Sequence, residues 1–561
     1  MNKKRVFYGK ALVLGRDNRS FLSVVRSLGR NNIEVHGGFC APDIAALQSR
    51  YLSVFHSGID FKADSLEWKD VLISVLKEEK FDLVIPCEDT SAYYLHLFKE
   101  ELSKYARFYL LDDLAYDVTR DKQKTCDLAK SLGIPVPRQT EIRKTGLIDL
   151  DKICTEFGFP VVIKPPVSFN KTSASRNFVK KAYSADEFKQ IMTTVPDDTA
   201  VIIQENCIGT GIGVELLAHN GESLVAFQHE RVHEPLMGGG SSYRKSVKPD
   251  PYLLEASKNI LSALRYTGVA MVEFKSDPKT GRWVLLEING RFWGSLPLPV
   301  SLGVDFPFYL YELFVHGKKS FPQNYRANRY CRNLPRDWLW MRQNYHADKT
   351  DPTLATRPMW KVVAEFFNIL LLRESNDTLV LDDPKPGIAE FSTLFRNIRK
   401  EYTDKIIEKL TRRKAKKSFR KARCVLFVCK GNICRSPFAS AVARLYTNKK
   451  IVSAGYYPYP NRKSPDTAIL AAREFDIDIS AHRSQIINKP LVNQADCIIV
   501  FDKFNLETLR DSFPYARHKI YLFGFLTDTM KEVSDPFNKD IDEFKKVYRQ
   551  IKTVLEKFKR K

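Results

Sequence analysis

A cysteine and an arginine flank a short polar loop in the last quarter of the chain. Residues 424–437 are Cys-Val-Leu-Phe-Val-Cys-Lys-Gly-Asn-Ile-Cys-Arg-Ser-Pro. The apolar run up to Cys429 predicts a buried strand, and Pro437 with the small apolar residues after it predicts a helix. Backbone N–H groups between these elements can line an anion site at the helix N-terminus. The spacing therefore predicts a cysteine nucleophile inside a phosphate-binding loop.

The loop also holds side chains that phosphoryl transfer to sulfur requires. Arg435 comes six positions after Cys429, and its planar guanidinium can bind two phosphoryl oxygens. Together with the Ser436 hydroxyl, it would hold the cysteine as the thiolate that attacks phosphorus. Asn432 tolerates the positive φ of a tight loop around an anion. The leaving oxygen needs a proton, and Asp535, within an Asp-Pro-Phe sequence, is a candidate general acid.

Residues 421–561 resemble the low-molecular-weight protein-tyrosine phosphatases. In this family the catalytic loop comes first and an Asp-Pro loop follows about one small domain later, which is the order found here. The resemblance implies a small α/β domain with a central parallel sheet, a phosphocysteine intermediate and Asp535 as the general acid. It also implies that Asn432, Ser453 and His482 form a hydrogen-bond network that supports the catalytic loop.

Residues near the expected pocket bear on its substrate. Ile433 stands where relatives that act on phosphoarginine carry threonine, which favours phosphotyrosine. Phe537 is one candidate wall for the substrate ring, and the opposite wall can come from Tyr456, Tyr457 and Tyr459. Relatives commonly counteract bacterial tyrosine kinases that control surface polysaccharide. The resemblance therefore implies a phosphotyrosine protein as partner, with such a kinase as a candidate.

Carboxylates lie on two neighbouring predicted strands in the middle of the chain. Glu273 sits within a Val-Glu-Phe sequence, and Glu287 opens the run Glu-Ile-Asn-Gly-Arg. Because side chains alternate along a strand, Glu287, Asn289 and Arg291 point to one face. The oxygen atoms of Glu273, Glu287 and Asn289 suit Mg²⁺ that bridges ATP phosphates. Arg291 would stabilise the transferring γ-phosphoryl group.

These strands, with the segments from Asp121 onward, resemble ATP-grasp enzymes. The resemblance implies ATP and Mg²⁺ as cofactors, and a carboxylate substrate that is activated as an acyl phosphate and passed to an amine or similar nucleophile. It also implies that two lysines neutralise phosphate oxygens and that the backbone of residues 204–208 meets adenine. The serine-rich segment 168–177 is expected to cover the phosphates. The expected ATP-binding residues are Lys122, Lys164, Gln204, Glu205, Cys207, Ile208, Arg231 and Arg291.

Length and composition indicate several folded domains. With 561 residues, of which 44% are hydrophobic, the chain can form several buried cores. Strand and helix patterns alternate along residues 1–115, which predicts a parallel α/β unit, and Gly15 is not followed by the glycine fingerprint of a dinucleotide site. We predict an α/β multidomain protein with a preATP-grasp domain at residues 1–115, an ATP-grasp domain at 116–320, a helical extension and basic connector at 321–420, and a phosphatase domain at 421–561.

Cysteine usage and hydropathy bear on location. The ten cysteines show no paired spacing, and one of them must be a free thiolate, which indicates a reducing cytoplasm. The longest apolar stretch, residues 359–372, is short and contains Lys361 and Glu365. We therefore expect no membrane-spanning helix.

Basic residues concentrate ahead of the phosphatase domain. Residues 396–423 contain thirteen lysines and arginines against three acidic residues, a local charge of +10 within a net charge of +23. We favour a solvated helical linker between two enzymes. The alternative is weak contact with an anionic membrane surface. Because no nucleic-acid-binding module accompanies the charge, we expect no specific nucleic-acid partner.

The two resemblances together predict a bifunctional enzyme, an ATP-dependent carboxylate–amine ligase joined to a protein-tyrosine phosphatase. Two alternatives remain open. In the first, the phosphatase half acts on a small metabolite made by the ligase half, so that protein is never a substrate. In the second, the ATP-binding half is a nucleotide sensor that regulates the phosphatase.

Overall fold

The computed structural model describes residues 6–39, 44–61, 66–143, 150–167, 169–170, 175–176, 178–196, 199–236, 238–351, 353–528 and 532–559. The chain forms two compact units, Met1–Leu394 and Phe395–Lys561. Most of the segment expected to cover the ATP phosphates, residues 168–177, lies outside the described residues. The finer four-part division stays a prediction.

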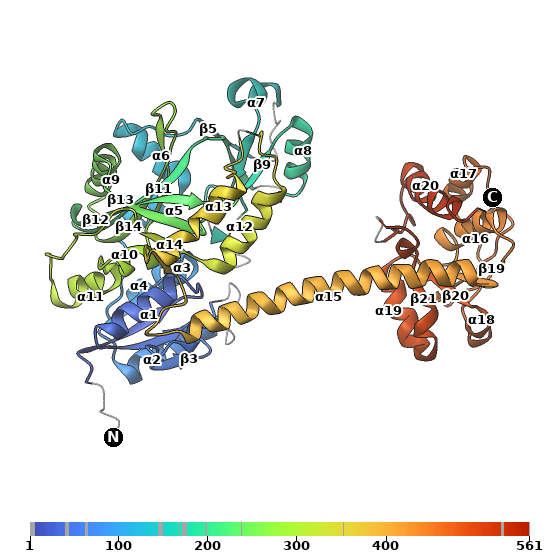
Figure 1. The fold of residues 1–561 in the computed structure, drawn as a ribbon, viewed down its shortest axis with the longest axis horizontal. Coiled ribbons are helices and arrows are strands. Elements are labelled where there is room, and N and C mark those ends of the chain that lie inside the picture. The colour runs from blue at the N-terminus through green and yellow to red at the C-terminus, as the bar shows by residue number, and fades with distance from the viewer. Residues whose placement is uncertain are drawn as a thin grey trace. The chain divides into compact units, whose positions relative to one another are not determined.

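A parallel sheet forms the first part of the N-terminal unit (blue in Figure 1). Its strands, in spatial order, are β3 (Val54–His56), β2 (Ile33–Gly38), β1 (Gly9–Leu14) and β4 (Leu83–Pro86). The helices of this part are α1 (Ser20–Arg30), η1 (Ala45–Gln48), α2 (Glu67–Glu79), α3 (Asp89–Leu97), α4 (Lys99–Leu102) and α5 (Asp113–Arg120). Successive side chains of β1 enter different cores, because Ala11 lies in the same core as Val24 of α1, and Leu12 in the same core as Leu72 of α2. Both faces of β1 are therefore covered, which explains its apolar sequence.

A smaller antiparallel sheet follows along the chain. Its strands, in spatial order, are β5 (Gln139–Arg143), β10 (Ala200–Glu205), β6 (Val161–Lys164) and β9 (Lys180–Ala182). Neighbouring elements are α6 (Lys122–Ser131), α7 (Leu150–Phe157), α8 (Ala185–Thr193) and the short pair β7 (Phe169–Asn170) and β8 (Ser175–Arg176). Asp121 caps α6, because its side chain accepts hydrogen bonds from the first-turn N–H groups of Gln123 and Lys124. This cap places Lys122 at the start of the helix.

A seven-stranded sheet completes the N-terminal unit. Its strands, in spatial order, are β15 (Trp283–Asn289), β14 (Gly268–Ser276), β11 (Thr210–His219), β12 (Glu222–His233), β13 (Tyr243–Val247), β16 (Tyr330–Arg332) and β17 (Glu374–Asn376). All neighbours are antiparallel except the parallel pair β16 and β17. The helices of this part are α9 (Pro251–Ala263), α10 (Pro297–Ser301) and α11 (Phe306–His316). The register sets Glu273 opposite Glu287, so the two expected metal-binding carboxylates lie side by side.

Residues 321–420 are only partly helical. They contain α12 (Leu334–His346), α13 (Met359–Glu365), α14 (Phe367–Leu370) and most of the long helix α15 (Lys385–Lys421, orange in Figure 1). They also contribute β16 and β17 to the large sheet, which the sequence did not indicate. In the part of the chain that the structure describes, no helix is both long and apolar enough to cross a membrane. Membrane contact of residues 396–423 stays a prediction.

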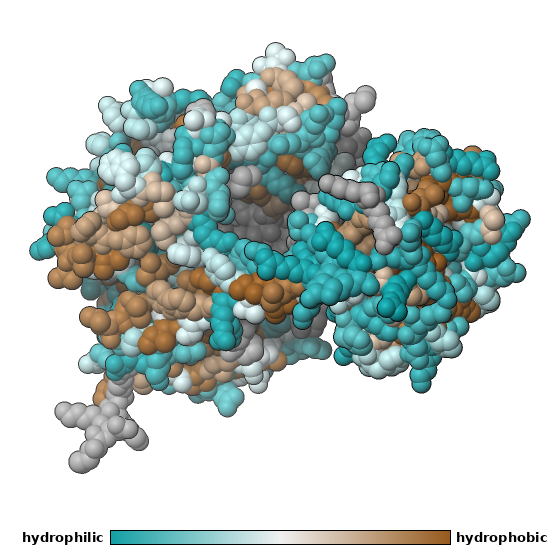
Figure 2. Space-filling model, turned by 45° about the vertical axis from the view of Figure 1, so that its right-hand side comes forward, coloured by the Kyte–Doolittle hydropathy of each residue, from teal (hydrophilic) through white to brown (hydrophobic). Residues whose placement is uncertain are grey.

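The C-terminal unit is a parallel sheet between helices. Its strands, in spatial order, are β19 (Lys450–Gly455), β18 (Cys424–Cys429), β20 (Cys497–Val500) and β21 (Ile520–Leu522). Its helices are α16 (Arg435–Tyr446), α17 (Asp466–Arg473), α18 (Lys489–Gln494), α19 (Lys503–Ser512), η2 (Pro514–Lys519), η3 (Phe523–Leu526) and α20 (Ile541–Glu556). Phe438 of α16 stacks on Tyr548 of α20 with ring centroids 3.8 Å apart, which fixes these helices together. The face of this unit seen in Figure 2 is largely hydrophilic.

Candidate functional sites

The catalytic loop expected from the sequence joins β18 to α16. Cys429 is the last residue of β18, and its side chain is buried. The Ser436 hydroxyl oxygen lies 3.0 Å from the cysteine sulfur, and the backbone N–H of Asn432 donates to the same sulfur over 3.3 Å. These contacts hold the sulfur inside the loop that joins β18 to α16.

Asn432 holds the loop in shape from inside. Its φ of +55° lies in the left-handed region, which asparagine adopts more readily than most residues. Its side-chain amide donates to the Ser436 hydroxyl over 2.9 Å, and its side-chain oxygen accepts from the backbone N–H of Gln485 over 2.9 Å. His482 Nε2 lies 2.8 Å from the Asn432 carbonyl oxygen. The Gln485 side chain donates to the Ser453 carbonyl over 2.8 Å, so Gln485 connects Ser453 to the loop. This glutamine was not identified from the sequence.

Arg435 and Asp535 meet beside the loop. Arg435 is buried, and its Nη2 donates to Asp535 Oδ2 over 2.7 Å. Its Nη1 donates to Asp502 Oδ2 over 2.6 Å and to the Val533 carbonyl over 3.0 Å. The expected general acid and the expected phosphate-binding guanidinium therefore lie together. Asp502, which binds the guanidinium two residues after the end of β20, was not identified as a site residue from the sequence.

Charges around Arg435 keep its guanidinium ionised. Burial alone would lower its pKa, but Cys429, Asp535 and Asp502 raise the pKa above its usual value. Burial would raise the pKa of Asp502, yet hydrogen bonds from Asn505 and Arg435 give a net lowering. Asp502 is therefore a carboxylate at neutral pH, as its role beside a guanidinium requires.

Aromatic residues lie next to the catalytic loop. The backbone N–H groups of Tyr456 and Tyr457 donate to the Lys430 carbonyl over 3.1 and 3.0 Å, which anchors them to the loop. Burial raises the pKa of Tyr456 to about 12, so its phenol stays protonated. Tyr459 and Phe537 are largely exposed. These positions are compatible with a wall around a substrate ring, and that role stays a prediction.

The residues expected to bind ATP line one cavity of the N-terminal unit. Its volume is about 870 Å³, within the range of small-molecule sites. The lining contains every expected ATP-binding or magnesium-binding residue except Ile208, which is 54% exposed outside it. The cavity lining includes residues from the four-stranded antiparallel sheet, the seven-stranded sheet and the N-terminal ends of α1, α3 and α6.

The three expected magnesium ligands lie on the neighbouring strands β14 and β15. Glu287 Oε1 accepts a hydrogen bond from the Asn289 amide over 3.2 Å. Arg231 Nη2 lies 2.5 Å from a Glu273 oxygen, and its positive charge lowers the pKa of Glu273. Burial outweighs this effect, so the pKa of Glu273 is raised overall. A divalent cation here would favour the ionised carboxylates and would relieve their mutual repulsion. These three oxygen-bearing side chains therefore fit Mg²⁺.

The two lysines expected to bind phosphate oxygens, Lys122 and Lys164, both line the cavity. Burial lowers the pKa of Lys164 to about 8, and repulsion from Lys122 acts in the same direction. The Lys164 ammonium donates to Gln204 Oε1 over 3.1 Å. The backbone N–H of Lys122 donates to the Pro166 carbonyl over 2.9 Å, which brings α6 to the end of β6. Phosphate oxygens between the two ammonium groups would offset both the burial and the repulsion.

The segment expected to meet adenine is held by its own side chains. Glu205 accepts from Arg138 Nε over 2.9 Å and from Arg282 Nη2 over 2.5 Å. These bonds outweigh burial and lower the pKa of Glu205. The Glu205 backbone N–H also donates to the Arg138 carbonyl over 3.0 Å, and contact of the backbone of residues 204–208 with adenine stays a prediction. Cys207 lies in the cavity lining, and burial raises its pKa to about 11.

Arg291 is oriented by a residue from another part of the fold. Its Nε and Nη2 donate to the two oxygens of Asp89, the first residue of α3, over 3.0 and 2.9 Å. Burial would lower the pKa of Arg291, but Asp89 and Glu287 raise it above its usual value. The sequence did not identify Asp89. Three arginines in the cavity lining were also not identified from the sequence: Arg16, Arg19 and Arg336. Arg16 and Arg19 follow β1, in the segment that lacks a glycine fingerprint.

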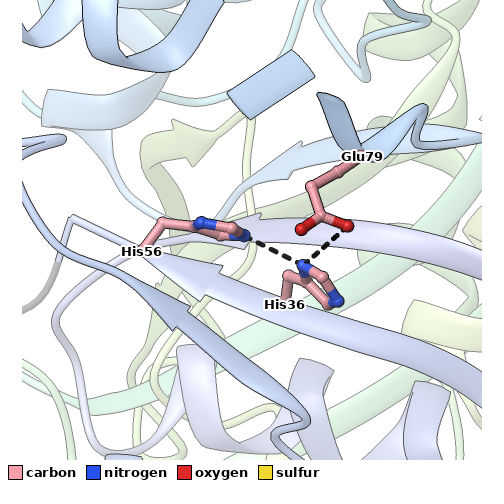
Figure 3. A group of neighbouring side chains, drawn as sticks. All are labelled: His36, His56 and Glu79. Atoms are coloured by element: carbon pink, nitrogen blue, oxygen red, sulfur yellow. Dashed lines mark hydrogen bonds and ion pairs between the residues drawn. The ribbon is translucent and has the colours of Figure 1, made fainter. Parts of the chain in front are cut away.

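A separate group of ligating side chains lies at the first sheet (Figure 3). His36 Nδ1 is 2.9 Å from His56 Nε2 and 4.0 Å from Glu79 Oε2. The Lys10 ammonium donates to the same Glu79 oxygen, and His36 Nε2 lies 3.4 Å from Glu34 Oε1. Burial lowers the pKa of both histidines. A hydrogen bond between the two rings explains the approach of His36 and His56, and the ion pair with Lys10 explains the position of Glu79. We therefore assign the group a structural role.

In the C-terminal unit, Cys429 and Arg435 lie at the two ends of the loop between β18 and α16, and the Asp535 carboxyl group accepts a hydrogen bond from Arg435. The family model for low molecular weight phosphotyrosine protein phosphatases matches residues 424–561. The chain is 34% identical over 134 residues to the low molecular weight protein-tyrosine-phosphatase Wzb of Escherichia coli K12, covering 24% of this chain and 88% of that protein. The chain therefore belongs, through its C-terminal unit, to the low-molecular-weight protein-tyrosine phosphatase family.

Other relatives show that membership does not fix the substrate. The probable low molecular weight protein-tyrosine-phosphatase AmsI of Erwinia amylovora is 30% identical over 135 residues, covering 24% of this chain and 93% of that protein. The protein-arginine-phosphatase of Bacillus subtilis is 30% identical over 137 residues, covering 23% of this chain and 91% of that protein. Proteins named for two different phosphorylated residues are thus similar to the same unit.

A second family model matches part of the N-terminal unit. The family model described as ATP-grasp in the biosynthetic pathway with Ter operon matches residues 197–332. The match includes the donor set for magnesium on β14 and β15 and Arg291 beyond them. The individual roles of these residues stay predictions.

Proposed function

We propose that the C-terminal unit hydrolyses phosphotyrosine in proteins through a phosphocysteine. The Cys429 sulfur attacks phosphorus, the phosphorus–oxygen ester bond breaks, and Asp535 donates a proton to the departing phenolate oxygen. Arg435 and the loop N–H groups hold the remaining phosphoryl oxygens while charge builds on them. In the second step Asp535 accepts a proton from water, whose oxygen attacks phosphorus and displaces the sulfur.

The convergence of Cys429, Arg435 and Asp535 on one loop carries this proposal. Two observations favour phosphotyrosine as the substrate. Ile433 is apolar and buried in the loop, and the aromatic residues Tyr456 and Tyr457 are hydrogen-bonded to the loop through their backbones. The kinship to phosphatases named for tyrosine supports a phosphotyrosine protein as partner, and a bacterial tyrosine kinase is our first candidate.

The test compares phosphate release from matched phosphotyrosine and phosphoarginine peptides and from a metabolite extract. We expect phosphotyrosine to be hydrolysed fastest and the Cys429→Ser chain to be inactive. Asp535→Asn should lower kcat by about 10²- to 10⁴-fold, because the leaving oxygen loses its proton donor. Rapid phosphate release from a small metabolite with negligible peptide turnover would instead support the metabolite alternative.

We propose that the N-terminal unit is a ligase that activates a carboxylate with ATP. Glu273, Glu287 and Asn289 would hold Mg²⁺, which neutralises charge on the ATP phosphates when bound. Lys122 and Lys164 bind phosphate oxygens. A carboxylate oxygen of the substrate attacks the γ-phosphorus, the bond to ADP breaks, and an acyl phosphate forms. An amine then attacks the acyl carbon, inorganic phosphate leaves, and the amine loses a proton to water.

One cavity that holds a magnesium donor set, two lysines and Arg291 carries the ligase proposal. The test is ADP production across a library of amino acids and amines. We expect ADP release to require both an acid and an amine and to be lost in the Glu287→Ala, Asn289→Ala chain. ADP release unaffected by that double change would contradict the magnesium assignment, and ATP binding without turnover would support the sensor alternative.

A further inference from the structure

One buried cation of the ATP cavity has no role in the reaction proposed above. Arg19, the residue before α1, lies in the cavity lining and is only 6% exposed. Within the described part of the chain, its Nε has no hydrogen-bond partner. Its other nitrogens make a 3.4 Å hydrogen bond to the Ser241 carbonyl and a 3.6 Å ion pair with Asp17. A buried guanidinium with such long contacts is unfavourable unless a further anion reaches it.

Arg19 is held beside the segment that follows Arg291. A side chain at Gly294 would place its Cβ 2.6 Å from the guanidinium carbon of Arg19, so the backbone at this position packs directly against the guanidinium. A Cβ at Gly240 would lie 3.8 Å from its two terminal nitrogens. The guanidinium is therefore fixed between two glycine backbones. It belongs to the same site as Arg291, but the two cations have separate partners.

The surroundings of Arg19 remain positive. Arg16 and Arg336 line the same cavity and are exposed to it. Asp17, the ion-pair partner of Arg19, is one acidic residue at this end of the lining. Glu88 and Glu390 also line the cavity, and burial raises the pKa of each, which favours their neutral forms. Burial lowers the pKa of Arg19. The negative charge of Asp17 acts in the opposite direction, and repulsion from Arg336 lowers the pKa further. An anion at this end of the cavity would compensate all three cations.

We propose that Arg19 binds a second anionic group of the ligase substrate, distinct from the carboxylate that ATP activates. The reacting carboxylate belongs at Arg291 and the magnesium donor set, so the fork of Arg19 is left for another part of the molecule. A guanidinium can donate two parallel hydrogen bonds to a carboxylate. The substrate class is therefore a dicarboxylic acid or an amino dicarboxylic acid, an inference that rests on the proposed ligase function.

The first test measures ADP production with matched acids, propionate against succinate and alanine against glutamate. In the unmodified full chain we expect each dicarboxylic acid to have at least about tenfold higher kcat/KM than its monocarboxylic partner. Arg19→Gln should abolish that preference and leave the KM for ATP unchanged. Arg19→Lys keeps the charge but not the fork, so it should retain part of the preference. Arg143→Gln, on the exposed strand β5 outside the cavity, is the matched control.

The second test measures binding without turnover, by thermal unfolding of the full chain with Mg²⁺ and a non-hydrolysable ATP analogue. Succinate or glutamate should raise the Tm of the unmodified and Arg143→Gln chains but not of Arg19→Gln. If no acid supports ADP release while this Arg19-dependent shift persists, the ligase proposal fails and the anion site stands. If the Arg19→Gln chain does not fold, the same measurement is made on the Arg19→Lys chain.

Two outcomes overturn the inference. One is equal turnover and equal thermal shifts for the monocarboxylic and dicarboxylic acids. The other is an Arg19-dependent shift with inorganic phosphate and none with succinate or glutamate, which would assign Arg19 to the phosphoryl oxygens of ATP.

Discussion

At the scale of single residues, Asp502 shows how the phosphatase site depends on a side chain outside the chemistry. One of its oxygens accepts from Arg435 over 2.6 Å, and the other accepts from the backbone N–H of Asn505 over 2.7 Å. The second bond caps α19. One carboxylate therefore joins the phosphate-binding arginine to the end of a helix. This arrangement fixes the guanidinium before a substrate arrives, which lowers the entropic cost of binding phosphate.

Replacing Asp502 with asparagine separates the charge of this residue from its capping role. Asparagine caps helices as well as aspartate does, so we expect the free energy of unfolding to change by less than about 1 kcal/mol. The weaker bond to Arg435 should lower kcat/KM for a phosphotyrosine peptide about tenfold. Steady-state kinetics and urea unfolding measure the two effects. Asp511→Asn, at the exposed end of the same helix, should change neither, and an Asp502→Asn enzyme of full activity would refute the positioning role.

His482 predicts a pH dependence of stability. Burial lowers its pKa below the ordinary value of 6.5 in the folded state. As pH falls through about 6.5, the unfolded chain therefore binds a proton that the folded chain does not, and the free energy of unfolding decreases until pH passes the folded pKa. We expect His482→Gln to flatten this decrease between about pH 7.5 and pH 5 in urea unfolding of the C-terminal unit. The control is His518→Gln, at an exposed site. If the free energy of unfolding changes equally with pH in the two variants, the predicted role of His482 is contradicted.

At the scale of elements, the sequence predicts what is continuous along the chain. The catalytic loop lies between an apolar strand and an adjoining helix, and the magnesium donors alternate along one strand, so both patterns are visible in a short window. The bond from Arg291 to Asp89 spans 202 residues and the bond from Arg19 to Ser241 spans 222, so no local pattern marks them. β16 and β17 have three residues each, too few for strand alternation to show.

The long helix α15 supplies an element-scale prediction, because its last turns are part of the phosphatase core. Phe419 is completely buried, with its ring centroid 4.8 Å from that of Phe558, whereas Phe395 on the same helix is 65% exposed. Phe419→Ala should therefore destabilise the C-terminal unit by about 3–5 kcal/mol, and Phe395→Ala by less than about 0.5 kcal/mol. Calorimetric unfolding of the full chain measures both. Similar small effects of the two changes would mean that α15 is only a linker.

At the scale of the whole molecule, the described residues of the two candidate sites fall in different units of the chain. The phosphatase site uses residues 429–537, and the ATP cavity is lined by residues 16–390. The unit boundary falls after Leu394, within α15, so the described residues that line the ATP cavity belong to the first unit and the described residues of the phosphatase site belong to the second. A coupling between the sites would require two states that the ligands bind differently.

We therefore expect the two activities to be independent in the full chain. Cys429→Ser should keep ADP production within about twofold of the unmodified chain, and the Glu287→Ala, Asn289→Ala chain should keep its phosphatase kcat/KM within the same margin, a difference of about 0.4 kcal/mol. Adding ATP with Mg²⁺ should leave phosphotyrosine hydrolysis unchanged. The nucleotide-sensor alternative makes the opposite prediction, because ATP would then alter the phosphatase rate of the unmodified chain but not of the double variant. Phosphatase assays on both chains with and without ATP distinguish the two, since only a sensor makes the ATP effect depend on the magnesium donors.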